Sequence, residues 1–159
     1  MKITAQEEYG LRVLIRIAAC KSPIGLSIPQ ITDAEGLSIH YVAKLTRILR
    51  IGGFINSTPG YKGGYVLARP AQSIGIKDVL RELGGVLFSD NFCGNHAGGL
   101  QLCTNSVDCS ARSLWNIIQI TVDQLLDKIT LHDLVNSERD SAKILNLLTE
   151  QNSLLSDIK

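Results

Sequence analysis

The chain has 159 residues, 45% hydrophobic and 19% charged, which suits a globular protein with a real core. No apolar stretch approaches the roughly 20 residues of a membrane-spanning helix, and the N-terminus MKITAQEEYG carries carboxylates where a signal peptide is apolar, so we expect a cytoplasmic protein with no membrane partner. The net charge is only +1, but residues 1–69 hold nine Lys/Arg against four Asp/Glu, and residues 70–159 hold seven against eleven.

The basic excess of the first half is concentrated in one stretch. Residues 36–69 contain no carboxylate but carry five basic side chains: Lys44, Arg47, Arg50, Lys62 and Arg69. A basic surface without acids attracts the phosphate backbone of nucleic acid, so the pattern favours a nucleic-acid-binding protein. For the charges alone, a solvated face of chance composition is the alternative.

Three predicted helices cover residues 4–20, 27–36 and 38–51. Ser27 and Ser38 are suited to cap the second and third helices, because a serine oxygen can accept the free N–H groups of a first turn. These two helices are joined by a tight turn that contains glycine, which is typical of a helix-turn-helix.

A predicted hairpin follows the third helix. Residues 54–57 and 65–68 have the character of short strands, and a glycine-rich loop separates them. Because a hairpin after a helix-turn-helix is a wing, the sequence predicts a mainly α protein with a winged helix-turn-helix domain over residues 1–70. The third helix would then enter the major groove of double-stranded DNA.

The second half is predicted to comprise a connector with a short helix (71–87), a cysteine-bearing loop (88–109), a long helix (110–136) and a tail (137–159). The long helix carries an apolar stripe: Leu114, Ile117, Ile118, Val122, Leu125, Leu126 and Ile129. This stripe favours a homodimer interface, and packing onto the chain's own domain is the alternative. Apolar residues at helical spacing in the tail predict a last helix.

Three cysteines crowd into seventeen residues of the loop: Cys93, Cys103 and Cys109. Thiolates bind soft or borderline metals. The gaps of nine and five residues contain no short knuckle of the kind that structural zinc prefers, and a glycine-rich loop with wide spacing favours an iron–sulfur cluster. Three alternatives stay open: a zinc site, a set of redox-sensing thiols without metal, and cysteines without chemistry.

Three thiolates leave one ligand position for another residue. The loop offers His96, with Asp90 and Asp108 beside it, and a carboxylate could also come from elsewhere. A weaker oxygen or nitrogen ligand would leave an iron open to oxidants, oxygen or nitric oxide. The chain has no nucleophile elbow, P-loop, zinc-protease or dinucleotide motif, so the sequence predicts no enzyme.

Three segments carry a family resemblance: MKITAQEEYGLRVLIRIA, GLSIHYVAKLTRILRIGGFINS and GGYVLARPA. They resemble the bacterial winged-helix iron–sulfur repressors that include IscR, NsrR and RirA, and the similarity extends from residue 1 to about 136. The resemblance implies a homodimer on a palindromic operator, with one iron–sulfur cluster per subunit that gates DNA affinity.

The resemblance also implies a ligand set. Three positions match the cluster cysteines of the family: Cys93, Cys103 and Cys109. Arg112 stands where IscR-like members have a histidine ligand, so we favour [4Fe–4S] over [2Fe–2S]. NsrR-like members take an N-terminal aspartate from the partner subunit, and the matching residue is Glu8. Glu8 from the other chain is therefore our first choice for the fourth ligand, and His96 is the second.

The candidate DNA contacts lie in the predicted recognition helix and wing. Base edges and phosphates are usually met from the front of such a helix, and phosphates from its later turns. The candidates are Ser38, His40, Tyr41 and Lys44 at the front, Arg47 and Arg50 as phosphate contacts, and Lys62 at the minor groove.

The sequence thus favours a DNA-binding repressor gated by an iron–sulfur cluster. The alternatives are a cluster-free regulator that senses thiol oxidation or a binding partner, and a cluster-carrying redox or assembly protein that binds no promoter.

Overall fold

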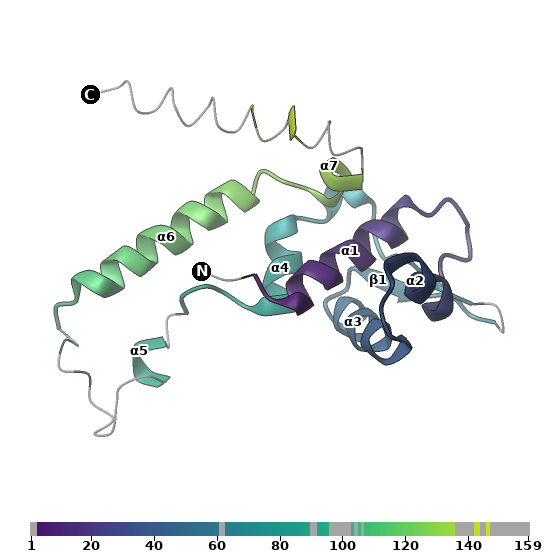
Figure 1. The fold of residues 1–159 in the computed structure, drawn as a ribbon. Helices are drawn as coiled ribbons and strands as arrows, with labels where there is room; N and C mark the ends of the chain where they lie inside the picture. The colour runs from purple at the N-terminus through teal and green to yellow at the C-terminus, as the bar shows by residue number, and fades with distance from the viewer. Residues whose placement is uncertain are drawn as a thin grey trace.

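The computed structural model describes residues 3–60, 63–89, 92–95, 103, 105, 107–135, 142, 143 and 146. They form a mainly helical chain with one two-stranded antiparallel sheet (Figure 1). Several predicted features lie outside the described residues: Lys62, Asp90, His96 and nearly all of the tail 137–159. Within the described part of the chain, no helix combines the length and the apolar character needed to cross a membrane.

The first three helices are α1 (Ala5–Ala19), α2 (Ile28–Glu35) and α3 (Ile39–Ile51). Capping chemistry explains where they begin and end. Thr4 and Glu7 cap the start of α1 reciprocally, the Thr4 N–H donating to Glu7 at 2.8 Å and the Glu7 N–H to Thr4 at 3.2 Å. Gly36 ends α2 in the left-handed region, at φ +66°. The predicted helix-turn-helix is confirmed.

The predicted wing is also present, as the antiparallel pair β1 (Ile55–Ser57) and β2 (Tyr65–Leu67). Its base is tied to the segment before α2, because Leu26 and Tyr65 exchange two backbone hydrogen bonds of 3.1 and 2.8 Å. The close approach requires glycine at position 25, where φ is +72° and a Cβ atom would lie 2.0 Å from the Tyr65 carbonyl oxygen.

One apolar core holds these elements together with η1 (Ala71–Ser73), α4 (Ile76–Gly84) and α7 (Leu131–Val135). We call this unit, from α1 to α4 with the wing and α7, the head. The chain returns to it after the long helix: the Ile76 N–H donates to Ile129 at 3.0 Å and the Leu131 N–H to Ile74 at 2.8 Å. Leu131 is fully buried, so the core extends beyond residue 70.

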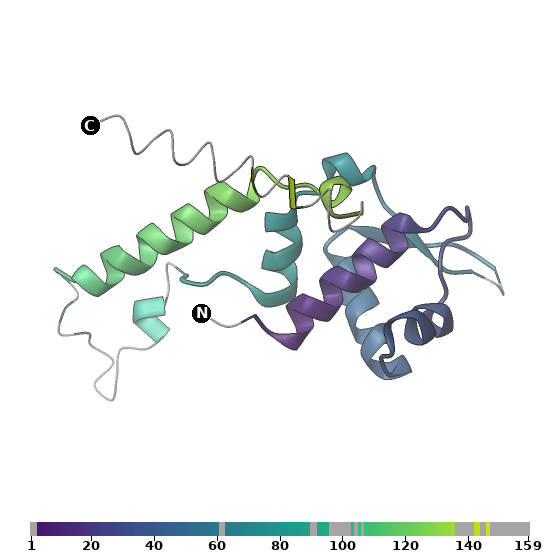
Figure 2. The same cartoon turned by 45° about the horizontal axis from the view of Figure 1, so that its top comes forward.

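Before residue 136, two of the described helices lie outside the head, and we call them the arm: α5 (Phe92–Asn95) and α6 (Ser110–Leu126). No residue of α6 is buried in the single chain. In both views the end of α6 lies beside α4, which separates it from α1, its first turn points away from the head, and α5 lies near that first turn (Figures 1 and 2). The short helices α5 and α7 were not predicted from the sequence.

Candidate functional site

The exposed side of α3 presents most of the predicted DNA contacts. Ser38, His40, Lys44, Arg47 and Arg50 are all exposed. The opposite side of the helix is buried in the head through Val42, Leu45, Thr46 and Leu49. The amphipathic pattern of α3 therefore leaves a polar, basic ridge in solvent, as a recognition helix needs.

Tyr41 differs from the other candidates because it is half-buried. Its ring packs edge-to-face on Tyr9 of α1, with centroids 6.1 Å apart and planes at 83°. The Arg12 guanidinium lies 5.5 Å from the Tyr9 centroid on the same helix. The start of α3 is thus positioned by aromatic contact with α1.

Two arginines of the basic first half share one carboxylate of the head. Arg12 and Arg16 of α1 both bind the Glu35 carboxylate, at 2.8 and 2.7 Å, and the Glu35 side chain is only 3% exposed. These ion pairs join α1 to the end of α2, and the three side chains together keep one positive charge.

The base of the wing is also held by a side chain. The Thr58 hydroxyl donates to the Ile24 carbonyl at 2.9 Å and accepts the Gly64 N–H at 2.7 Å. The groove between the wing and α2, about 810 Å³, is lined by Ser27, Gln30, Thr58 and Gly64, among others. The wing is therefore tied to the segment before α2, and its strand β1 also contacts α3.

All three loop cysteines are half-buried free thiols. Cys109 is the N-cap of α6, and its sulfur accepts the Arg112 N–H at 3.4 Å. Phe88 and Phe92 stack at 5.1 Å near Cys93, beside an apolar cavity of about 570 Å³ that Trp115 and other residues line. The α5 turn that carries Cys93 thus lies close to the same helix that Cys109 begins.

The described residues hold no group of three or more His, Cys, Asp or Glu side chains placed to bind a metal ion. The single chain therefore does not bring Cys93, Cys103 and Cys109 together as a finished site. Glu8 is exposed in the first turn of α1, where a second chain can reach it, and Asp108 is exposed beside Cys109. The donor chemistry, three thiols and an accessible carboxylate, fits an iron–sulfur cluster.

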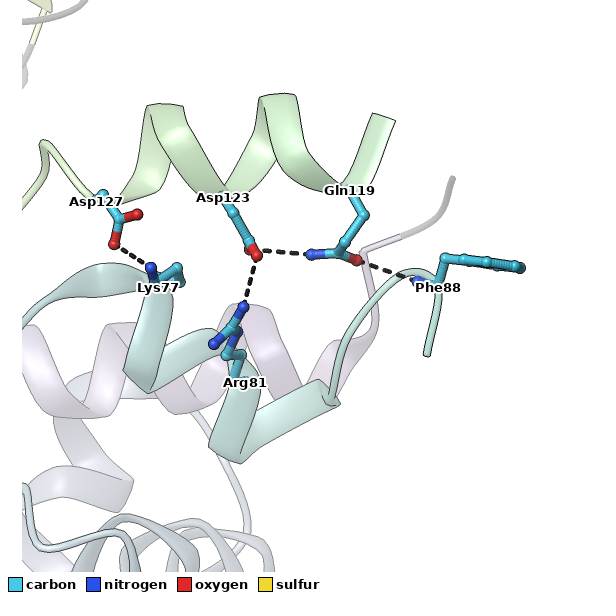
Figure 3. A network of polar contacts seen from close by, with 6 residues as sticks. All are labelled: Lys77, Arg81, Phe88, Gln119, Asp123 and Asp127. Atoms are coloured by element: carbon cyan, nitrogen blue, oxygen red, sulfur yellow. Dashed lines mark hydrogen bonds and ion pairs between the residues drawn. The ribbon is translucent and has the colours of Figure 1, made fainter. Parts of the chain in front are cut away.

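Polar contacts connect α6 to the head (Figure 3). Asp123 pairs with Arg81 of α4 at 2.5 Å and accepts the Gln119 side-chain amide at 2.9 Å. The Gln119 carbonyl in turn accepts the Phe88 N–H at 3.1 Å, at the start of the cysteine loop. Lys77 pairs with Asp127 one turn further along. We call this set the polar bridge.

The first turn of α1 lies directly against α4. The Gln6 side-chain amide donates to the Leu83 carbonyl, and a Cβ atom at Gly84 would lie 2.3 Å from the Glu7 carboxylate. A cavity of about 390 Å³ lies here, between the start of α1, one side of α4 with the segment that follows it, and one side of α6. The Glu8 turn, the polar bridge and α4 are therefore neighbours.

The family model for Rrf2, described as an iron-dependent transcriptional regulator, matches residues 3–137. The chain belongs to the Rrf2 family. This confirms the resemblance that the sequence carries, since IscR is among the similar structures. Rrf2 proteins are DNA-binding transcription regulators and not enzymes, so membership speaks against a redox or assembly protein that binds no promoter.

Three similar proteins cover most of this chain. Protein rrf2 of Nitratidesulfovibrio vulgaris is 35% identical over 140 residues, covering 85% of this chain and 87% of that protein. CymR of B. subtilis, the global cysteine regulator, is 30% identical with a TM-score of 0.61, covering 85% of this chain and 96% of that one. T. potens IscR is 27% identical with a TM-score of 0.64, covering 85% and 86%.

Sequence reasoning missed contacts between distant residues, both within this Rrf2 head and between the head and its arm. Arg81 and Asp123 are 42 residues apart, and Arg12 and Glu35 are 23 apart, so no local pattern pairs them. The sequence held one indication of the contacts between α4 and α6. Lys77 and Arg81 are one helical turn apart in α4, and two acids near the end of α6 have the same spacing: Asp123 and Asp127.

Proposed function

We propose that this protein is a homodimeric repressor whose affinity for a palindromic operator is gated by an iron–sulfur cluster. In each subunit α3 enters the major groove, and the wing with Lys62 meets the flanking minor groove. The observation that supports this best is the construction of α6: it begins at Cys109, has no buried residue, and is joined to the head by the polar bridge.

The apolar side of α6 supports the proposed dimer. Five large hydrophobic side chains of this helix are exposed: Leu114, Trp115, Ile117, Ile120 and Leu125. A contiguous apolar stripe on a helix of about 25 Å is unfavourable in water, and a second copy related by a two-fold axis would cover both stripes at once. That arrangement also presents two α3 helices to one operator.

The cluster ligands would be Cys93, Cys103 and Cys109, with Glu8 of a second copy as the fourth and His96 as the second choice. We favour [4Fe–4S] over [2Fe–2S], one cluster per subunit. When bound, such a cluster supplies iron that responds to redox state, oxygen, nitric oxide or iron supply. The half-burial of all three cysteines and the exposure of Glu8 support this ligand set.

The chain's own residues carry the signal. Drawing Cys93 and Cys103 toward Cys109 would move the first turn of α6, and the helix would carry that displacement to Asp123 and Asp127. Both acids form ion pairs with α4, so the displacement would reach this helix, whose buried side packs on α1 and α3. The two reading helices must match successive major grooves about 34–36 Å apart, so a small change in their spacing lowers operator affinity.

A cluster-free regulator is the second candidate. It is favoured by the free thiols of this chain and by 30% identity, with a TM-score of 0.65, to S. aureus CymR solved in an oxidised form. In that case oxidation of the loop cysteines, or a binding partner, would move α6 in place of the cluster.

Anaerobic purification, followed by a visible absorption spectrum and counts of iron and sulfide, distinguishes the two. We expect a brown protein with one cluster per subunit that is lost in Cys103→Ala and kept in Cys20→Ala, the matched control at the end of α1. A colourless, iron-poor protein even after reconstitution would leave the cluster-free regulator. Glu8→Ala with unchanged cluster stability would remove Glu8 from the ligand set.

A further inference from the structure

Two large apolar side chains of α3 are exposed, one at each end. Ile39 is the first residue of the helix and is 55% exposed, and Ile51 is the last and is 67% exposed. Single exposed hydrophobic residues are normal on protein surfaces, so exposure alone shows little. The position of Ile39 says more, because it follows the Ser38 cap and precedes His40 on the ridge described above.

The ridge changes character along its length. It begins with Ile39 and His40, and the small Ala43 follows one turn after Ile39. The exposed cations come only later: Lys44, Arg47 and Arg50. Since Arg and Lys suit phosphates and the front of a recognition helix suits base edges, the apolar position lies where sequence is read.

Only one apolar group is displayed in the major groove, the C5-methyl group of thymine. An isoleucine side chain has no donor or acceptor, so it can distinguish bases there only through that methyl group. Because its Cβ atom is branched, isoleucine strongly prefers one χ1 rotamer in a helix. Its methyl groups therefore point in one direction, and little side-chain entropy is lost on binding. Tyr41 is less free to do this, because its ring is held against Tyr9.

We propose that Ile39 is a specificity-determining residue that contacts the C5-methyl group of one thymine in each operator half-site. The proposal rests on the proposed function, in which α3 enters the major groove. It predicts a preference for thymine over cytosine at that base pair. It assigns selectivity to a side chain that is neither charged nor polar, unlike the other candidates on the ridge.

Replacing thymine by deoxyuridine removes only the methyl group and tests the proposal. The duplex is the tightest binder selected from a random library with the full-length protein, substituted at one symmetric pair of positions at a time. With the wild-type protein, deoxyuridine at one of these symmetric pairs of positions should lower operator affinity about fourfold per half-site. This is the effect expected from losing one buried methyl group. Ile39→Ala should bind the thymine and uracil duplexes equally, and Ile51→Ala should keep the wild-type difference.

Two results would overturn the proposal. Either no position shows a methyl effect with the wild-type protein, or the effect persists unchanged in Ile39→Ala. Lys44→Ala and Arg47→Ala identify which idea has failed. Suppose that these two substitutions weaken binding, while the methyl effect is absent or does not depend on Ile39. Then α3 contacts the DNA, but Ile39 does not contact a thymine methyl group. If they leave affinity unchanged, the placement of α3 in the groove is wrong as well.

Discussion

The head and the arm are held by different forces. The head is capped at its helix ends, closed by a continuous apolar core, and tied across its surface by the Glu35 ion pairs. The arm has no buried residue in α6 and meets the head mainly through partly exposed polar contacts, with the half-buried Leu126 at its last residue packed against the core. Apolar packing fixes geometry strongly, whereas exposed ion pairs contribute little, so the head suits a rigid reader and the arm suits an adjustable element.

The largest effect on stability should come from a substitution that leaves a cavity in the core of the head. Leu131 arrives from beyond the arm and is fully buried. Leu131→Ala should lower the free energy of unfolding by about 2–5 kcal/mol, because it removes packing that the surroundings cannot refill. Urea unfolding followed by circular dichroism measures this. Ile51→Ala, at a well-exposed position, should change the free energy of unfolding by less than about 0.5 kcal/mol. Equal effects of Leu131→Ala and Ile51→Ala would contradict the account of a head held by its apolar core.

The next effect concerns assembly. Ile117 lies in the apolar stripe of α6 and is 61% exposed in the single chain. Ile117→Glu should leave the head folded but place two carboxylates in the proposed two-fold interface, weakening dimerisation about 100-fold or more because buried unpaired charges are costly. Sedimentation velocity measures this. A dimer of unchanged affinity would mean that α6 is not the interface.

A moderate effect is expected at the surface of the head. Glu35→Gln should lower the free energy of unfolding by about 1–2 kcal/mol, since two charge-assisted hydrogen bonds from half-exposed arginines to a buried carboxylate are lost. Asp33→Asn, an exposed acid of the same helix, is the control. If both variants unfold at the same urea concentration as the wild type, the α1–α2 ion pairs do not contribute to the stability of the head.

The smallest change in stability should come from the polar bridge. Asp123→Asn should cost less than about 1 kcal/mol, because Arg81 is 44% exposed and its ion pair is solvated. The same variant should narrow the difference in operator affinity between cluster-loaded and cluster-free protein by about threefold. Gln124→Ala, exposed on another side of α6, should leave that difference unchanged. An unaltered difference in Asp123→Asn would exclude the bridge from the signal path.

The predictability of the molecule follows the same division. The starts of α1, α2 and α3 were predictable because local contacts within three residues set them. Thr4 and Ser38 accept an N–H of the first turn, whereas the Ser27 N–H donates to the Gln30 side chain. The wing was predictable from two short apolar runs around glycines. The return of Leu131 into the core and the packing of Tyr9 on Tyr41 were not, because distant residues decide them.

The candidate site divides in the same way. The polar ridge of α3 was predicted from helical spacing and charge. The loop cysteines were predicted as ligands, but a single chain does not complete a metal site among its described residues, since a second subunit and the cluster itself would be needed. Arg12 and Arg16 add to the basic count of residues 1–69, but both pair with Glu35 of α2, which the sequence did not indicate.

Operator affinity before and after cluster removal tests the central claim most directly. Fluorescence anisotropy with one labelled operator, at fixed salt and under anaerobic conditions, gives the dissociation constant of the loaded protein and of the same preparation after chelation. The account predicts a difference of at least about tenfold, equivalent to about 1.4 kcal/mol, that disappears in Cys103→Ala. Equal dissociation constants for the two forms of a protein shown to hold iron would contradict it.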